Sequence, residues 1–451
     1  MSSVLRTPMA HQTDALNYCG NRGRIALFME MRLGKTLVAI RWAKQESRGR
    51  ILIVAPLSVL PSWYEELENE LIAKKTIHWL IGPKSKRHLP AQEHTGGWFL
   101  VNYECLRVSP ELQSIPWSTI ILDESTKVRN PQAQITKVVQ KRFYHVPRKA
   151  VLSGLPAPES PLDYFEQFRF LNKQFMSFDN FWKFRNYFFQ TDYTGWDWRP
   201  RVGATTKIKE AVHAGAFVLT RKQVNVGSKK IYEKRYVEMT NDQKKLYEQV
   251  EETFEYKRND FEKATKWATV KFTWLARLAG GFDPTGEVCV SPTKCAELLN
   301  LLQGELKNEK VVVWFRFNSE LFYVAESLER AGIQHVYITG ETPMEGRQAA
   351  AEHFRISSGC RVMLAQVKCG KYGLNWSAAS TAIYYSNSYD MEDRAQSEDR
   401  ILHPSKTEPL LYIDLITKGT IDESVVEVLR QKYANSRIFM TKLVKAWLEK
   451  V

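Results

Sequence analysis

A glycine, a lysine and a threonine, Gly34-Lys35-Thr36, follow an apolar run and begin a stretch with helical periodicity. In this setting, backbone N–H groups at a helix N-terminus bind phosphate oxygens, the lysine reaches the β- and γ-phosphates, and the threonine hydroxyl ligates Mg²⁺. We therefore interpret residues 29–36, MEMRLGKT, as a phosphate-binding loop in which Arg32 and Leu33 also border the nucleotide. The match is incomplete, because Met29 stands where the full pattern has its first glycine, and a lone GKT triplet also arises by chance.

Two adjacent acids, Asp123 and Glu124, end a second apolar run, about ninety residues further along the chain. Such a pair can divide its work: Asp123 holds Mg²⁺, partly through water, and Glu124 orients or deprotonates the attacking water. The alternative is that both acids only cap the following helix. Their combination with the loop at this spacing predicts hydrolysis of a nucleoside triphosphate.

These residues need a scaffold, and the chain alternates short apolar runs with helical periodicity, which predicts parallel sheets covered on both faces. We expect strands in five runs of the first third, residues 24–31, 50–57, 97–104, 117–125 and 148–156. The pattern returns late in the chain, in residues 309–317, 334–340, 360–366, 380–386 and 408–416. The predicted fold class is α/β, with two separate parallel sheets.

The segment between the two sheets has a different composition. Residues 164–302 are rich in aromatic and basic residues and in long amphipathic helical patterns. We therefore expect three parts: a first lobe at 1–163, a helical insertion at 164–302, and a second lobe at 303–451. The aromatic side chains can form a helical core or stack on bases as a strand-separating wedge, and four of them are candidates for the wedge: Phe181, Trp182, Trp196 and Trp198.

Charge and cysteine content narrow the setting. The chain of 451 residues carries 64 Lys and Arg against 50 Asp and Glu, a formal net charge of +14, which favours a polyanionic partner such as nucleic acid or an anionic membrane. Its six cysteines include no C-x-x-C pair, as expected in a reducing compartment. The first residues do not resemble a secretory signal, and no apolar run approaches the length needed to cross a bilayer. We expect a soluble, cytoplasmic protein.

Taken in order, the motifs resemble those of the SNF2-like group of superfamily 2 helicases, over about residues 5–432. HQTDALNY is similar to the adenine-reading Q motif, with Gln12 at the glutamine position, and MEMRLGKT to motif I. VAPLSVLPSW, NYECLR, DESTKVRN and LSGLPAPES resemble motifs Ia, Ib, II and III. In the second lobe, KVVVWFRF, LAQVKCGKYGLNWS and RAQSEDRILHP resemble motifs IV, V and VI.

The resemblance implies two RecA-like lobes with the helical insertion between them, and a DNA-dependent ATPase and helicase that uses ATP and Mg²⁺. The short chain resembles the compact bacteriophage members of the group, which implies a role in replication, recombination or repair. A motor of this architecture can work as a monomer. Gly373 would contact the nucleotide. Contacts to the DNA backbone would come from Pro56, Ser58, Tyr103, Arg316, Thr339, Gly340, Lys368 and Asn375. Two alternatives stay open: a duplex translocase that does not separate strands, and an ATP-gated DNA-binding switch.

Departures from the family pattern concern catalysis. Motif VI usually carries two arginines three residues apart, whereas here Arg400 is followed by His403. Either residue could supply the finger that stabilises charge on the γ-phosphate. Thr126 replaces the usual histidine of motif II, and Lys371 and Tyr372 alter the glycine stretch of motif V. The net positive charge would collect in a DNA groove that receives four basic residues of the middle segment: Arg221, Lys222, Lys229 and Lys230.

Overall fold

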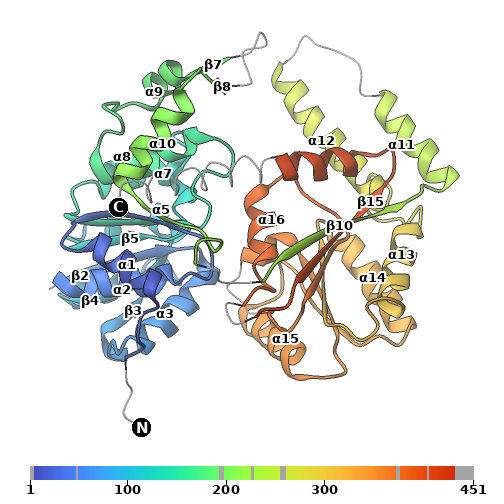
Figure 1. The fold of residues 1–451 in the computed structure, drawn as a ribbon, viewed down its shortest axis with the longest axis horizontal. Coiled ribbons are helices and arrows are strands. Elements are labelled where there is room, and N and C mark those ends of the chain that lie inside the picture. Colours follow the sequence, from blue (N-terminus) through green and yellow to red (C-terminus); the bar gives the residue numbers. More distant parts are fainter. Residues whose placement is uncertain are drawn as a thin grey trace. The chain divides into compact units, whose positions relative to one another are not determined.

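The computed structural model describes residues 5–46, 49–191, 198–224, 228–253, 261–371, 376–403 and 406–431. The chain divides into two compact units, residues 1–226 with 433–451, and residues 227–432 (Figure 1). The aromatic and basic middle segment is therefore shared: its part before residue 227 belongs to the first unit and its part after 226 to the second.

The first unit is built on a parallel sheet of seven strands, in the order β3-β4-β2-β5-β6-β1-β9. The strands are β1 (Arg24–Met29), β2 (Arg50–Ala55), β3 (Ile77–Trp79), β4 (Gly97–Asn102), β5 (Thr119–Leu122), β6 (Arg148–Leu152) and β9 (Phe217–Leu219). A separate antiparallel pair is formed by β7 (Phe189–Thr191) and β8 (Trp198–Pro200). Because all the strands of the main sheet are parallel, their carboxyl ends meet at one edge, where ligands bind in open α/β sheets.

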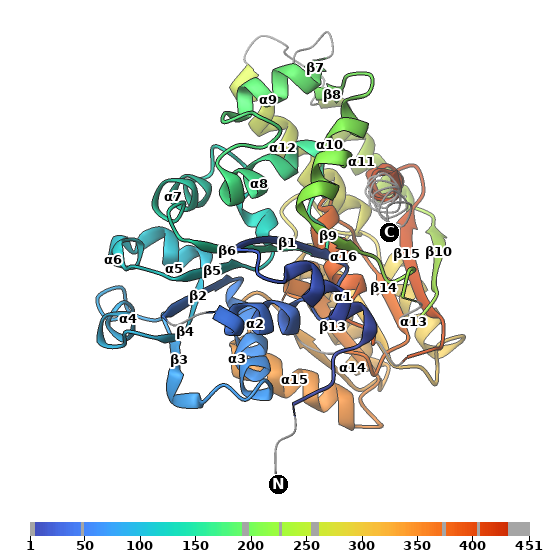
Figure 2. The same ribbon diagram turned by 60° about the vertical axis from the view of Figure 1, so that its left-hand side comes forward.

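Helices cover both faces of this sheet (Figure 2). The α-helices are α1 (Ala10–Cys19), α2 (Lys35–Glu46), α3 (Leu60–Asn69), α4 (Leu89–Glu93), α5 (Tyr103–Val108), α6 (Pro110–Ser114), α7 (Gln134–Arg142), α8 (Tyr164–Asn172), α9 (Phe181–Phe188) and α10 (Ala204–Gly215). Short 3-10 turns are η1 (Leu57–Val59), η2 (Lys74–Thr76), η3 (Ser125–Val128) and η4 (Pro161–Asp163). Side chains alternate along β1, so that Phe28 packs toward α4–α10 and Leu27 toward α1–α3.

The second unit has a parallel sheet of six strands, in the order β10-β15-β14-β11-β13-β12. Its strands are β10 (Lys230–Val237), β11 (Val311–Phe315), β12 (His335–Ile338), β13 (Val362–Gln366), β14 (Thr381–Tyr384) and β15 (Leu410–Thr417). Its helices are α11 (Asn241–Thr253), α12 (Phe261–Ala279), α13 (Thr293–Gln303), α14 (Asn318–Arg330), α15 (Met344–Ile356) and α16 (Met391–Glu398), with the turn η5 (Val367–Lys371). One core contains α13 and α14, and the core on the other face contains α15.

The predicted α/β class with two parallel sheets is confirmed, and all ten expected strands are present. Five further strands were not expected: the antiparallel pair β7 and β8, and three strands of the two parallel sheets. β3 and β9 have three residues each, too few for a recognisable pattern. β10, KIYEKRYV, lies at the edge of its sheet and carries four charged residues among its eight, so its sequence lacks the apolar run of a buried strand.

The aromatic segment forms mainly core. Phe184 and Phe188 of α9 are buried, and Phe181 and Trp198 pack partly against the same core. Trp182 differs, because 41% of its surface is exposed. Trp196 lies outside the described residues. Within the described part of the chain, no helix is both long and apolar enough to cross a membrane.

Candidate functional site

The phosphate-binding loop lies between β1 and α2, at the carboxyl edge of the first sheet. Gly34 has a positive φ of 80°, and a Cβ there would approach Gln12 Nε2 to 2.1 Å, so only glycine fits. The Lys35 ammonium donates to the carbonyl of Met29 at 2.8 Å. Thr36 is the second residue of α2, whose N-terminal N–H groups favour an anion. Arg32 also has a positive φ, 67°.

Gln12 of α1 lies directly against this loop. Its Oε1 accepts from the backbone N–H of Met9 at 2.9 Å, and its Nε2 donates to the Leu33 carbonyl at 3.5 Å. A ring nitrogen of His11 is 3.1 Å from the same carbonyl. Gln12 and the loop were both predicted from sequence and lie together, while His11 was missed although it is adjacent to Gln12.

Asp123 and Glu124 follow β5 on the same edge of the sheet. Burial raises the pKa of the Asp123 carboxyl, while the Trp63 indole and the Lys35 ammonium act to lower it. Trp63 Nε1 donates to Asp123 Oδ2 at 2.7 Å, and the Glu124 N–H donates to Oδ1 at 2.9 Å. Glu124 has a left-handed backbone, φ 48°, and its side chain does not cap η3. This geometry does not favour the helix-capping alternative.

Motif III closes the other side of the loop. A Cβ at Gly154, just after β6, would lie 2.9 Å from Met31 Cγ and 3.5 Å from Lys35 Nζ. The carboxyl ends of β1, β5 and β6, which are neighbouring strands, therefore converge on Lys35. This is the arrangement expected of a nucleotide site in a parallel sheet.

An ion pair behind the loop was not predicted. Arg221, which follows β9, pairs with Glu30 at 3.2 Å and donates its backbone N–H to the same carboxylate at 3.0 Å. The Glu30 N–H in turn donates to the Leu219 carbonyl at 2.9 Å. Arg221 is therefore engaged in holding the end of β1, which differs from the DNA-facing position expected from its charge. No sequence signal links residues so far apart.

A pocket in the first unit, apart from the phosphate-binding loop, contains two of the predicted DNA contacts. It has a volume of about 330 Å³, and Pro56 and Tyr103 both line it, whereas Ser58 is buried beneath the surface. Two basic residues that sequence reasoning missed, Arg107 and Lys127, also line it. The Tyr103 hydroxyl donates to the Asp123 carbonyl at 2.7 Å, so this pocket is joined to the acidic end of β5 by one hydrogen bond.

The predicted DNA contacts of the second unit lie after β11, β12 and β13, which are adjacent in its sheet. The Arg316 guanidinium is over the Phe317 ring at 5.0 Å, and burial lowers its pKa. The Gly340 N–H donates to Gln366 Oε1 at 2.9 Å. Thr339 is buried, and Lys368 of η5 is exposed. Gly373, Asn375 and Tyr372 are outside the described residues.

Motif VI begins with α16 and is held by a buried network. The Arg394 guanidinium is over the Tyr384 ring at 3.4 Å, and it donates to Glu398 at 2.8 Å and to Asn387 at 2.7 Å. Lys230 of β10 pairs with Glu398 at 2.9 Å and with Asp399 at 3.1 Å. Lys230, expected in a DNA groove, instead holds this helix.

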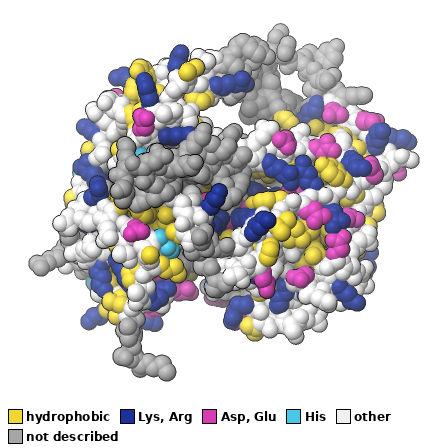
Figure 3. Space-filling view, in the orientation of Figure 1, with side chains coloured by type: hydrophobic (Ala, Val, Ile, Leu, Met, Phe, Trp, Pro, Cys, Tyr) yellow, Lys and Arg dark blue, Asp and Glu magenta, His cyan; other side chains and the backbone are white. Residues whose placement is uncertain are grey.

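The two candidate finger residues follow directly. Arg400 donates its backbone N–H to the Ser397 carbonyl at 3.2 Å and accepts from the Trp376 N–H with its own carbonyl. Arg400 and His403 are both partly exposed. On the face shown in Figure 3, basic side chains are scattered and interleaved with acidic ones over both units.

Comparison with known proteins identifies the class to which this fold and site belong. A family model for the SNF2-related domain matches residues 11–279, and a model for the helicase conserved C-terminal domain matches residues 293–404. The chain belongs to the SNF2-related family, within superfamily 2.

Individual relatives are distant. The chain is 23% identical over 446 residues to the SWI/SNF-related matrix-associated actin-dependent regulator of chromatin subfamily A-like protein 1 of Drosophila melanogaster, covering 97% of this chain and 57% of the relative. It is 24% identical to MG018 of Mycoplasma genitalium, named an uncharacterized ATP-dependent helicase, over 89% of this chain and 39% of the relative. The chain thus spans about half the length of the curated relatives it matches. The SWI2/SNF2 ATPase core of Sulfolobus solfataricus, solved with double-stranded DNA, aligns at 19% identity and a TM-score of 0.46, covering 97% of this chain and 95% of that one.

Proposed function

We propose that this protein is a DNA-dependent ATPase that moves on DNA and unwinds or branch-migrates forked or junction DNA during replication, recombination or repair. The observation that carries this proposal is the convergence of Gln12, Gly34, Lys35 and Asp123 on one edge of a parallel sheet, in a member of the SNF2-related family. The relatives named as ATP-dependent helicases support the activity.

In the proposed reaction, the N-terminus of α2 and the Lys35 ammonium bind the β- and γ-phosphates of ATP, and Gln12 contacts the adenine. Glu124 positions the attacking water and accepts its proton. Its backbone has a left-handed conformation, with a φ of 48°, of the kind that persists at functional sites. Arg400 or His403 of the second unit stabilises the charge that develops on the γ-phosphate.

The chain also has the groups that Mg²⁺ requires. The Thr36 hydroxyl and the Asp123 carboxylate are hard oxygen ligands, and Lys35 acts to keep Asp123 ionised despite its burial. The described residues contain no cluster of three His, Cys, Asp or Glu, which suits an ion that takes its other ligands from phosphate and water. When bound, Mg²⁺ neutralises charge on the β- and γ-phosphates.

DNA binding is coupled to ATP hydrolysis, in this proposal, through the pocket at Pro56 and Tyr103. Lys127 on its lining suits a phosphate backbone, which is read without sequence preference, while Arg107 is paired with Glu104, which also lines the pocket. The Tyr103 hydroxyl on the Asp123 carbonyl gives a direct route by which a strand in this pocket shifts the end of β5. The motor is proposed to act as a monomer.

The deciding experiment incubates the protein with labelled forked, Holliday-junction and blunt duplex DNA, with and without ATP, beside Lys35→Ala. ATP-dependent release of single strands supports a helicase. Displacement of a triplex strand without unwinding supports instead the duplex translocase, which the relatives named for chromatin regulation also favour. DNA binding that responds to ATP without DNA-stimulated hydrolysis leaves the ATP-gated switch and refutes the motor.

Two sets of variants assign the chemistry. Glu124→Gln is expected to bind ATP normally and to lose turnover by at least about 100-fold, as expected for loss of general base catalysis. Arg400→Ala and His403→Ala, compared singly, identify the finger as the variant with the larger loss of ATPase rate. Full activity in both would remove motif VI from the proposed mechanism.

A further inference from the structure

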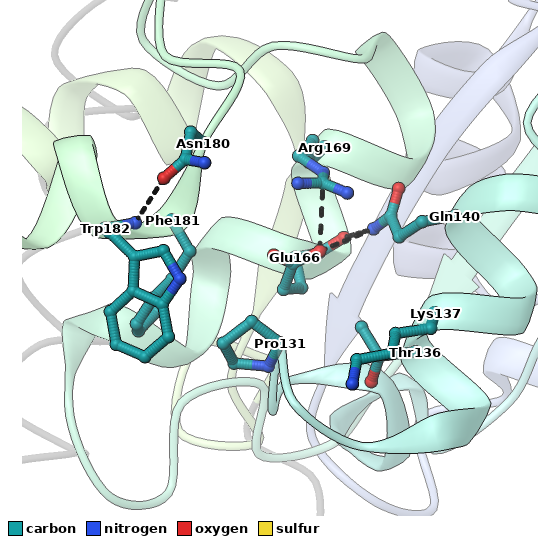
Figure 4. Close-up of a pocket in the computed structure, with 9 residues that line it drawn as sticks. All are labelled: Pro131, Thr136, Lys137, Gln140, Glu166, Arg169, Asn180, Phe181 and Trp182. Atoms are coloured by element: carbon teal, nitrogen blue, oxygen red, sulfur yellow. Dashed lines mark hydrogen bonds and ion pairs between the residues drawn. The ribbon is translucent and has the colours of Figure 1, made fainter.

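A cavity of about 140 Å³ in the first unit is used neither by the nucleotide site nor by the pocket at Tyr103. It lies among α7, α8 and α9 (Figure 4). Its lining combines two aromatic rings, a proline and six polar or charged side chains, namely Pro131, Thr136, Lys137, Gln140, Glu166, Arg169, Asn180, Phe181 and Trp182.

One wall of this cavity is aromatic and fixed in position. The rings of Phe181 and Trp182 are in edge contact, with centroids 5.2 Å apart. Arg185 stacks on Trp182 at 4.6 Å and on Trp198 at 3.6 Å, which holds the indole in place. Phe184 of the same helix is completely buried in the core, whereas 41% of the Trp182 surface is exposed. The indole is thus a prearranged stacking surface that the core does not require.

The opposite wall presents hydrogen-bonding groups at set positions. Glu166 is buried, and its carboxylate accepts from Gln140 Nε2 at 2.9 Å and pairs with Arg169 at 3.4 Å. Thr136 is 1% exposed, and its hydroxyl has no hydrogen-bond partner among the described residues. A buried hydroxyl without a partner is costly, and in Figure 4 it borders the cavity with Lys137. A nucleobase is bound by stacking on an aromatic face and by hydrogen bonds to donors and acceptors at its edge, and this cavity has both kinds of group.

Size and position restrict the ligand further. The cavity is smaller than the roughly 300–1,000 Å³ of pockets that enclose drug-sized ligands, so it admits one ring system. Ile135 lines the Tyr103 pocket and Thr136 lines this cavity, so the two sites lie on either side of the first turn of α7. Lys137 adds positive charge suited to a polyanion, while the charge of Arg169 is balanced by its ion pair with Glu166.

We propose that this cavity receives a single unpaired base of DNA, stacked on Trp182 and hydrogen-bonded at its edge by Thr136 and Gln140. This inference rests on the proposed function, because it takes DNA as the ligand that reaches the neighbouring pocket. It assigns Trp182 of α9 a role in holding a separated strand. Phe181 supports the indole from its edge.

The test compares Trp182→Ala with Tyr187→Ala, an aromatic residue of the same helix that is 60% exposed and does not line the cavity. Stacking on one aromatic ring contributes about 1–3 kcal/mol per base. Trp182→Ala should therefore bind forked DNA with a single-stranded arm about 5- to 150-fold more weakly. Binding of blunt duplex should be unchanged, and Tyr187→Ala should match wild type on both substrates. Trp182→Phe should restore most of the loss.

A second measurement does not depend on affinity. A fork carrying 2-aminopurine in its unpaired arm should change fluorescence on binding wild type, and Thr136→Val should weaken this response while retaining the helix. Equal losses on fork and duplex in Trp182→Ala, or no loss on either, would refute the cavity as a base site. In both of those outcomes, DNA-stimulated ATPase in wild type leaves the proposed function standing, whereas its absence overturns the proposed function itself.

Discussion

At the scale of single residues, the candidate ATPase site depends on a hydrogen bond to a buried acid. Asp123 is 6% exposed, and burial alone would favour its protonated form. Trp63, fully buried on α3, donates to its Oδ2. Because this N–H bonds best to the charged carboxylate, Trp63 helps to keep Asp123 ionised and able to bind a cation.

Trp63→Phe should therefore raise the pKa of Asp123 and move the acid limb of the ATPase pH profile to higher pH. A hydrogen bond to a charged group contributes about 1.5–3 kcal/mol, enough to move this limb measurably. Trp42→Phe is the matched control, because Trp42 is equally buried and its indole donates to a backbone carbonyl, that of Arg22. An acid limb that stays in place in Trp63→Phe would contradict this role.

Tyr103 allows a test of whether DNA binding is transmitted to the ATPase site. Tyr103→Phe keeps the ring and removes the hydroxyl, which donates to the Asp123 carbonyl. We expect basal ATPase to be retained and DNA stimulation to fall by about 2- to 10-fold, the effect of a neutral hydrogen bond of 0.5–1.5 kcal/mol. Steady-state ATPase assays with saturating DNA measure this. A fall in basal and stimulated rates by the same factor would show that the hydroxyl does not transmit DNA binding.

At the scale of elements, the charged edge strand β10 holds the motif VI helix. Lys230 bridges Glu398 and Asp399, the Tyr232 hydroxyl donates to Glu398 at 2.8 Å, and Tyr232 stacks on Tyr412. Burial opposes the charge on Glu398, but Lys230 and Arg394 outweigh it and lower the pKa of this carboxyl. The position of the residues that follow α16, including Arg400, thus depends on β10.

Lys230→Met should destabilise the protein and slow ATP hydrolysis, because it removes the cation that bridges two buried acids and leaves Glu398 with Arg394 alone as its cationic partner among the described residues. Breaking such a pair costs about 3–5 kcal/mol. Lys230→Arg should retain most of both properties, and Lys229→Met, at an exposed neighbour, should resemble wild type. Urea unfolding and ATPase rates measure the two effects. Wild-type stability in Lys230→Met would show that β10 does not hold α16.

At the scale of the whole molecule, the basic residues behind the net charge of +14 fall into two groups, those in internal ion pairs and those at the surface or in a pocket. Arg221 and Lys230 form internal ion pairs, whereas Lys127 lines a pocket and Lys368 is exposed after β13. The overall positive charge favours DNA as a partner. It does not follow that every basic residue contacts DNA.

DNA affinity should therefore fall steeply with salt, and the slope should report individual contacts. Lys127→Ala and Lys368→Ala should each reduce the slope of log K against log salt by about 0.9. Lys141→Ala, at the far end of α7 from the pocket, should leave it unchanged. Fluorescence anisotropy between low and high salt gives these slopes. Equal slopes in all three variants would remove both residues from the proposed interface.

Local patterns in the sequence were enough to predict both parallel sheets and to select the candidate nucleotide residues at the carboxyl edge of the first one. Buried strands in parallel sheets are continuous apolar runs, and a phosphate loop is a contiguous segment whose glycine and lysine act within a few residues of each other. For the same reason β3, β9 and β10 were missed, since two are very short and one is charged. The ordered motifs were also sufficient to identify the family.

Only the tertiary structure decided which distant side chains meet. Trp63 with Asp123, Glu30 with Arg221, and Lys230 with Glu398 are pairs separated by 60, 191 and 168 residues. Asp123, Glu30 and Arg221 meet their partners at the carboxyl edge of the first sheet, whatever the order of its strands in the chain. Lys230 instead begins β10 and meets Glu398 at the amino end of its strand. The type of a residue sets the chemistry it can perform, but its burial and partners decide whether an arginine holds a strand or faces a ligand.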